Sequence, residues 1–182
     1  MEFDYRIPTN RPGVVYDETK FDRLFAEDMQ GVYDALTILY AFGDYIFSAV
    51  LEHPQNFPPS GSYQKVKLDS VEFDPTEMWD FVAFKMITPI SGVYKFDCNL
   101  GIVFPSPALL PAQIALYKNG TLVKESIQTI QPPRASLQIS AMISLHHTDI
   151  VELYILNPMA PSCNIAINSK ENWLTCQLVQ EG

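Results

Sequence analysis

The stretch Gly92–Leu100, GVYKFDCNL, decides how this chain folds. Its apolar side chains recur at every second position, and polar side chains fill most of the positions between them. The apolar positions are Tyr94, Phe96, Cys98 and Leu100. A period of two places one set of side chains on each face of an extended strand. The stretch therefore predicts a half-buried β-strand.

The same period recurs from Lys65 onward in several short runs separated by turn residues. The clearest are SLQISAMISL (136–145), DIVELYIL (149–156), CNIAIN (163–168) and WLTCQLV (173–179). Asn119-Gly120, between two further runs, is typical of a two-residue hairpin turn. About nine short strands with turns between them predict an antiparallel sandwich or jelly roll of the mainly β class.

The residues before this region have a different pattern. Residues 1–18 contain Pro8 and Pro12 and predict an extended arm. Thr19 with Asp22 resembles a helix-capping pair, so residues 19–53 are predicted to form one long α-helix. Residues 54–64 hold three of the fourteen prolines and predict a hinge. The β head domain is then expected over residues 65–182.

The second half of the predicted helix, Val32–Leu51, is almost entirely apolar and has no Lys or Arg. Apolar residues step alternately by four and three positions, with Gly43 as the one gap. The seam is Phe25, Met29, Val32, Leu36, Leu39, Ile46 and Val50. This spacing is typical of a helix that packs against other helices.

Three structures of this segment remain open. It is long enough to span a membrane, but Asp34 and Asp44 disfavour insertion. It could also fold back onto its own β domain. The heptad spacing favours the third structure, an oligomeric stem or anchoring helix between subunits.

Composition excludes several classes of partner. The chain has 182 residues, of which 18% are charged and 47% hydrophobic, and its net charge is −9. Its bases are scattered, so nucleic acid and anionic lipid are poor partners. The three cysteines are expected to be buried free thiols. The N-terminus shows no signal-peptide pattern, so none is expected.

The sequence gives little support for catalysis. It has no GxSxG elbow, P-loop, dinucleotide fingerprint or HExxH motif. His146-His147 with Asp149 and Glu152 could form a metal cluster, but adjacent residues of a strand point to opposite sides. We therefore expect no catalytic residue, no metal and no cofactor.

The β region also resembles a known family. The segment FKMITPISGVYKF (84–96) is similar to a motif of the complement C-one-q globular head, which belongs with the tumour-necrosis-factor-like jelly rolls. The matching residues are Phe84, Pro89, Gly92, Tyr94 and Phe96. The resemblance covers about residues 65–180, with Thr148 where the family commonly has Gly. It implies a homotrimer in which the motif forms the jelly-roll core or lines the trimer axis.

The N-terminal segment RPGVVYDETKFDRLFAEDMQGVYDAL (11–36) resembles the head-proximal part of bacteriophage fibre and decoration proteins. That resemblance implies a homotrimeric capsid decoration (cement) or head-fibre protein, made in the host cytoplasm and placed on the virion surface. Its partners would be the major capsid protein or a tail or portal protein. The alternatives are a receptor-binding knob or other trimeric module that binds a carbohydrate or protein, and a sugar-processing enzyme on the same scaffold.

Overall fold

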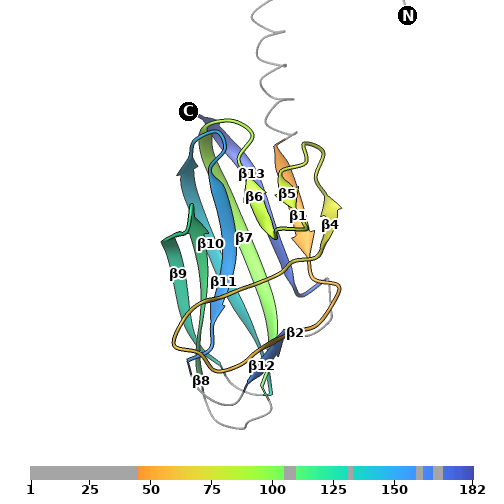
Figure 1. The fold of residues 1–182 in the computed structure, drawn as a ribbon, viewed down its shortest axis with the longest axis vertical. Coiled ribbons are helices and arrows are strands. Elements are labelled where there is room, and N and C mark those ends of the chain that lie inside the picture. The colour runs from red at the N-terminus through yellow and green to blue at the C-terminus, as the bar shows by residue number, and fades with distance from the viewer. Residues whose placement is uncertain (1–44, 105–109, 131–132, 159–161, 166–169) are drawn as a thin grey trace, which may run out of the picture. The chain divides into compact units, whose positions relative to one another are not determined.

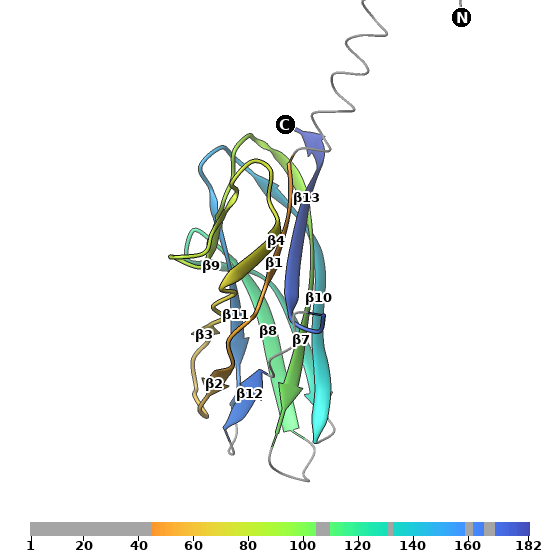
Figure 2. The same ribbon diagram turned by 90° about the vertical axis from the view of Figure 1, so that its right-hand side faces the viewer.

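Two antiparallel sheets lie face to face in the part of the chain that the structure describes (Figures 1 and 2). The computed structural model describes residues 45–104, 110–130, 133–158, 162–165 and 170–182. These residues form thirteen β-strands and no helix. The predicted mainly β antiparallel sandwich is confirmed.

Sheet A has seven strands with the long β7 at its centre. Along β7, β10 pairs on one side, while β13 and then β12 pair on the other. The sheet continues from β13 to β1 and β4, and from β12 to β2. Its strands are β1 (Ile46–Val50), β2 (Gln55–Phe57), β4 (Ser70–Phe73), β7 (Gly92–Val103), β10 (Arg134–Leu145), β12 (Cys163–Ile165) and β13 (Trp173–Glu181).

Sheet B has six strands in the order β5-β6-β11-β8-β9, with β3 beside β11. They are β3 (Gln64–Lys65), β5 (Trp79–Asp80), β6 (Lys85–Ile87), β8 (Leu110–Lys118), β9 (Thr121–Ile130) and β11 (Ile150–Leu156). The connection between β2 and β4 crosses this sheet as a strap (Figure 1). Tyr63 fastens the strap, because the single proton of its hydroxyl points to two acceptors, Gln113 Oε1 at 2.9 Å and Glu125 Oε2 at 2.8 Å.

The core lies between the two sheets and is filled by the alternating side chains that the sequence singles out. Tyr94, Phe96 and Leu100 of β7 are fully buried, as are Ile114 and Leu116 of β8 across from them. Each strand thereby removes half of its side chains from water, at about 25 cal/mol per Å² of apolar surface. The other half of each strand is left facing outward.

The predicted helix is wrong at its C-terminal end, because Ile46–Val50 form strand β1. This strand pairs with β13 and β4, and Phe47 is fully buried with its ring 5.3 Å from that of Trp79. This segment, IFSAV, is short and mostly apolar, and so short a run fits both helical and strand periods. The segment forms a strand because pairing with β13 and β4 supplies hydrogen-bond partners for its backbone N–H and C=O groups. The same pairing buries Phe47.

The predicted boundaries change accordingly. The head domain includes Tyr45 onward rather than beginning at residue 65, and the predicted hinge over 54–64 contains β2 and the first residue of β3. Ile46 and Val50 therefore belong to a sheet and not to a helix seam. The other seam residues and the arm lie outside the described residues. Among the described residues no helix is long and apolar enough to cross a membrane.

At one end of the sandwich, a polar cluster holds two turns together, the one between β8 and β9 and the one between β10 and β11. Asn119-Gly120 joins β8 to β9 with φ of 49° and 76°, as the hairpin signal predicts. Asn119 donates to Asp149 Oδ1 at 2.7 Å, and Lys118 Nζ lies 2.8 Å from Asp149 Oδ2. The His146 backbone N–H also donates to that carboxylate at 2.7 Å.

These contacts change the acidity of Asp149. Burial by itself would raise the pKa of the carboxyl. The hydrogen bonds from Lys118, His146 and Asn119, with the charge of Lys118, outweigh burial and lower the pKa to about 2. The folded state therefore favours the ionised form of this group.

Thr148 occupies a strained backbone position in the same turn, with φ of 72°. The left-handed region disfavours β-branched residues, and this is where the resembling family commonly has Gly. The backbone is held there, because the Thr148 N–H donates to Thr88 O at 2.8 Å.

Thr148→Gly is expected to stabilise the protein by about 0.5–1.5 kcal/mol, because relief of the strain exceeds the extra chain entropy of glycine. Thermal melting should show an increase of about 2–4 °C in Tm. Thr129→Gly, at an exposed position one residue from the end of β9, is the matched control and should lower Tm, because the backbone there has no positive φ. Equal decreases in both variants would contradict the strain at Thr148.

Asp149→Asn is expected to destabilise the fold by about 1–3 kcal/mol at neutral pH. Asp149 has a folded pKa below its unfolded value of 3.8, so its contribution is present above pH 3.8 and is lost as pH falls toward 2. Urea unfolding from pH 7 to pH 2 should therefore show a smaller acid dependence in the variant. An unchanged acid dependence would refute the assignment to Asp149.

Candidate functional site on sheet A

The family-motif residues are divided between the core and the turn that leads into β7. Tyr94 and Phe96 are fully buried within one chain, and the Tyr94 hydroxyl donates to Ile90 O at 2.9 Å. Burial is the main cause that raises the pKa of Tyr94 to about 12. Phe84, at a φ of 53°, packs partly buried against the core, and half-buried Pro89 follows β6. Neither aromatic side chain of β7 is left for a partner.

Gly92 is required by a close approach rather than by a turn conformation. A Cβ atom at this position would lie 2.4 Å from Gln180 O and 2.6 Å from Leu178 Cδ1, both on β13. No heavy side-chain atom fits there without movement of the β13 backbone. Glycine at the start of β7 thus lets β13 pair along the strand.

The outward side chains of β7, β10 and β13 form a polar surface, which we call the A face. Paired residues align them in rows across the strands: Ser140–Asp97–Thr175 in one row and Gln138–Asn99–Trp173 in the next. Beyond β13, Ser48 of β1 pairs with Thr175. Met142 of β10 lies on the same side and is 61% exposed.

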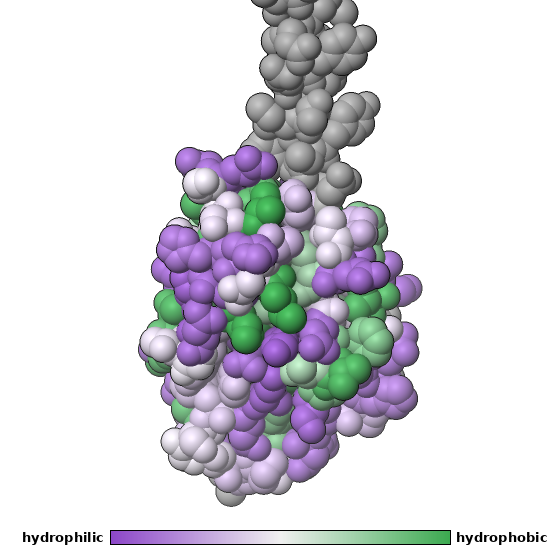
Figure 3. Space-filling model, turned by 45° about the horizontal axis from the view of Figure 1, so that its top comes forward, coloured by the Kyte–Doolittle hydropathy of each residue, from purple (hydrophilic) through white to green (hydrophobic). Residues whose placement is uncertain are grey.

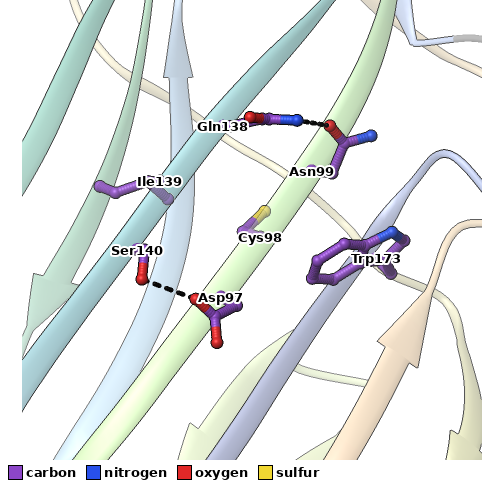
Figure 4. Close-up of a pocket in the computed structure, with 7 residues that line it drawn as sticks. All are labelled: Asp97, Cys98, Asn99, Gln138, Ile139, Ser140 and Trp173. Atoms are coloured by element: carbon purple, nitrogen blue, oxygen red, sulfur yellow. Dashed lines mark hydrogen bonds between the residues drawn. The ribbon is translucent and has the colours of Figure 1, made fainter.

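Hydrogen bonds hold these side chains in place. Ser140 donates to Asp97 Oδ1 at 2.6 Å, and Gln138 Nε2 donates to Asn99 Oδ1 at 3.0 Å (Figure 4). Lys95 Nζ lies 2.8 Å from Asp97 Oδ2. The hydrogen bonds from Lys95 and Ser140 lower the pKa of Asp97. The A face is therefore a fixed lattice of polar groups rather than a set of loose side chains.

Trp173 and Asp97 lie between two shallow hollows of the A face. One hollow, of about 250 Å³, is drawn in Figure 4 and lies over β7 and β10. Its lining is Asp97, Cys98, Asn99, Gln138, Ile139, Ser140 and Trp173. The other, of about 510 Å³, extends toward β1 and β4 and is lined by Ser48, Glu72, Asp97, Lys170, Trp173 and Thr175. A partly exposed indole is thus surrounded by amides, hydroxyls and carboxylates.

The charges around the A face balance. Its own strands carry Lys95, Arg134 and Asp97, and the residues beside them add the base Lys170 and the acids Glu72 and Glu171. Arg134 pairs with Glu171 at 2.7 Å, and Lys95 pairs with Asp97. A chain of net charge −9 therefore presents one broad surface without net charge.

The thiol beneath the hollow of Figure 4 is not an activated nucleophile. Cys98 lies below the hollow, but it is only 3% exposed, and burial raises the pKa of its thiol far above the usual range. A buried neutral thiol is a poor nucleophile. Within the described ranges, no three His, Cys, Asp or Glu side chains are placed to hold a metal ion. The arrangement is suited to binding.

The sequence analysis missed Trp173 and the A face. The alternation in SLQISAMISL and WLTCQLV predicts the outward positions, including Gln138, Ser140 and Thr175. It does not show which strands are neighbours. Trp173 meets Asn99 only because β13 pairs with β7.

Comparisons with known proteins support the fold. No family model matches the sequence, and no curated protein matches it. Several solved structures have the same architecture at low identity. Murine APRIL is 11% identical with a TM-score of 0.56, covering 74% of this chain and 98% of that one. The globular domain of zebrafish complement 1qA protein is 13% identical with a TM-score of 0.54, covering 76% and 99%.

Eiger TNF from S. frugiperda is 8% identical with a TM-score of 0.57, covering 76% of this chain and 92% of that one. At these identities the likeness shows the fold and leaves the activity open. The described part of the chain thus has the jelly-roll fold of the tumour-necrosis-factor and complement C-one-q type.

Proposed function

We propose that this chain is a non-enzymatic structural module that assembles as a homotrimer through the A face. The observation that carries the proposal is the neutrality of that face in an acidic chain. Copies that share a net charge of −9 repel one another at most surfaces, and a face with balanced charges avoids this repulsion.

Two further features support an interface at the A face. Met142 is 61% exposed and Trp173 partly exposed, and side chains of these types are enriched in subunit interfaces. Among the described strands, β10 pairs only with β7, so its outer edge has unpaired backbone groups over part of its length. A homotrimer is also what the resemblance to the complement C-one-q heads implies.

For the more specific role, we propose a virion decoration or head-fibre protein. The resemblance of residues 11–36 to phage fibre and decoration proteins supports it, together with the order of a predicted arm and helix before a jelly-roll head. In this proposal the N-terminal residues attach to the major capsid protein or to a tail or portal protein. The head then projects from the particle.

The specific observation that favours a second function is the setting of Trp173. An indole flanked by Asn99, Gln138 and Asp97 has the chemistry of a carbohydrate subsite, with an aromatic face and planar polar groups. In this alternative the chain is a recognition module, and the A face binds a sugar instead of another subunit. The two functions would use the same surface. Substitutions on that surface therefore distinguish them, because one function predicts a change in assembly and the other a change in sugar binding.

Light scattering of the full chain at micromolar concentration is expected to give a trimer. Met142→Glu places a charge on the A face and should raise the concentration at which the trimer dissociates by about tenfold or more. Val82→Glu is the matched control, because Val82 is 76% exposed in the turn between β5 and β6, and its trimer should be unchanged.

A monomeric wild-type chain at that concentration would overturn the trimer. A trimer equally resistant to dilution in Met142→Glu would show that the interface lies elsewhere. A monomer whose Trp173 fluorescence responds to added monosaccharides, with loss of the response in Trp173→Phe, would establish the alternative.

Removal of residues 1–44 is expected to leave a folded head that no longer joins virus particles. The deletion must end before Tyr45, because β1 begins at Ile46 and a longer one would remove a strand of sheet A. Co-sedimentation with particles, alongside circular dichroism of the truncated chain, measures both properties. A folded truncated chain that still decorates particles would place the attachment in the head.

A further inference from the structure

The turn between β5 and β6 presents two apolar side chains to water, in contrast to the polar side chains of the A face. Phe81 is 58% exposed and Val82 is 76% exposed. The turn is held in place, because Asp80 Oδ1 accepts hydrogen bonds from the N–H groups of Val82 at 3.0 Å and Ala83 at 2.8 Å. Exposed apolar residues on a well-held turn are candidates for contact with another molecule.

Beside this turn lies an open hollow of about 470 Å³, which we call the acidic hollow. Its apolar lining is Val71, Trp79 and Phe81, and its acidic lining is Asp74, Glu77 and Asp80. Trp79 is 4% exposed and forms a firm base, because it packs on Phe47 and donates from its indole to Leu68 O. The hollow is therefore built on the core.

The three carboxylates have no cationic partner within ion-pair distance among the described residues. The ion pairs there use other acids, namely Asp69, Asp97, Asp149, Glu152 and Glu171. Asp74 instead accepts hydrogen bonds from the backbone N–H groups of Met78 at 2.9 Å and Trp79 at 2.7 Å. These groups are uncharged, so they do not neutralise the carboxylate. Lys85, opposite Asp80 in the sheet, offsets part of the charge.

Hydrophobic and hydrophilic groups alternate closely over the face of the molecule shown in Figure 3. In the acidic hollow the two kinds adjoin, since Glu77 and Asp80 share it with the Phe81 ring. A guanidinium fits such a mixture, because it binds carboxylates through paired hydrogen bonds and stacks on aromatic rings. An aliphatic neighbour in the same peptide would cover Val82.

From this combination we infer that the acidic hollow is a docking site for an arginine-containing apolar segment of a partner protein. Charge complementarity selects this occupant. A second copy of the head is disfavoured, because the like-charged hollows and an acidic chain repel. Nucleic acid is disfavoured for the same reason. The inference does not depend on the trimer or on a virion.

The test uses the full chain and three fluorescein-labelled heptapeptides: alternating Arg and Leu, alternating Arg and Ser, and alternating Glu and Leu. Fluorescence polarisation should show that the Arg–Leu peptide binds, that the Arg–Ser peptide binds about tenfold more weakly, and that the Glu–Leu peptide does not bind. Added salt should weaken the binding of the Arg–Leu peptide.

Two variants locate the binding. Phe81→Ser should weaken it about tenfold, and Glu77→Gln about two- to fivefold, because a surface carboxylate is screened by water. Ile127→Ser is the matched control for Phe81, since Ile127 is 62% exposed on β9, and it should bind as the wild type does. All substituted side chains are exposed, and their melting temperatures verify that the variants fold.

Absence of Arg–Leu binding up to about 1 mM would overturn the inference. Equal binding of the Arg–Leu and Arg–Ser peptides would also overturn it, because charge alone would then explain the affinity. Binding unaffected by both Phe81→Ser and Glu77→Gln would place the peptide elsewhere on the chain.

Discussion

The register of β7 against its two long neighbours is the constraint on which the rest of the head depends. Because a strand has a period of two, a slip of one residue would exchange the core side chains of β7 for those of the A face. Tyr94 and Phe96 would then face water, and Asp97 and Asn99 would enter the core. The absence of a side chain at Gly92 allows β13 to approach one edge of β7. Pairing with β10 along the whole of β7 fixes the register at the other edge.

The same register makes the A face a coherent surface. Ser140, Asp97 and Thr175 come from three strands that are distant in sequence, yet they share a row. Since Asp97 and Asn99 are hydrogen-bonded to side chains of β10, this part of the surface is organised before anything binds to it. Preorganised polar groups lose little entropy on binding, which suits both an interface and a ligand site.

The distribution of charge separates two surfaces of the head. On the A face, acids are balanced by Lys95, Arg134 and Lys170. At the acidic hollow, Asp74 and Glu77 lack a balancing base nearby among the described residues. Copies of one acidic chain can meet at the first surface with little repulsion, whereas the second attracts groups of opposite charge. The two surfaces can therefore serve different partners.

The sequence by itself determined the strands of the head, because alternation in runs such as GVYKFDCNL and SLQISAMISL reports directly which side chains avoid water. It also determined the Asn119-Gly120 turn, because Asn and Gly are the residues that most readily adopt its positive φ angles. Only the tertiary structure decided that Ile46–Val50 form a strand, since so short a run, with four apolar residues and Ser48, fits either period and pairing with β13 selects one. It alone placed Trp173 beside Asn99, because contacts between distant strands depend on sheet order, which no local pattern encodes.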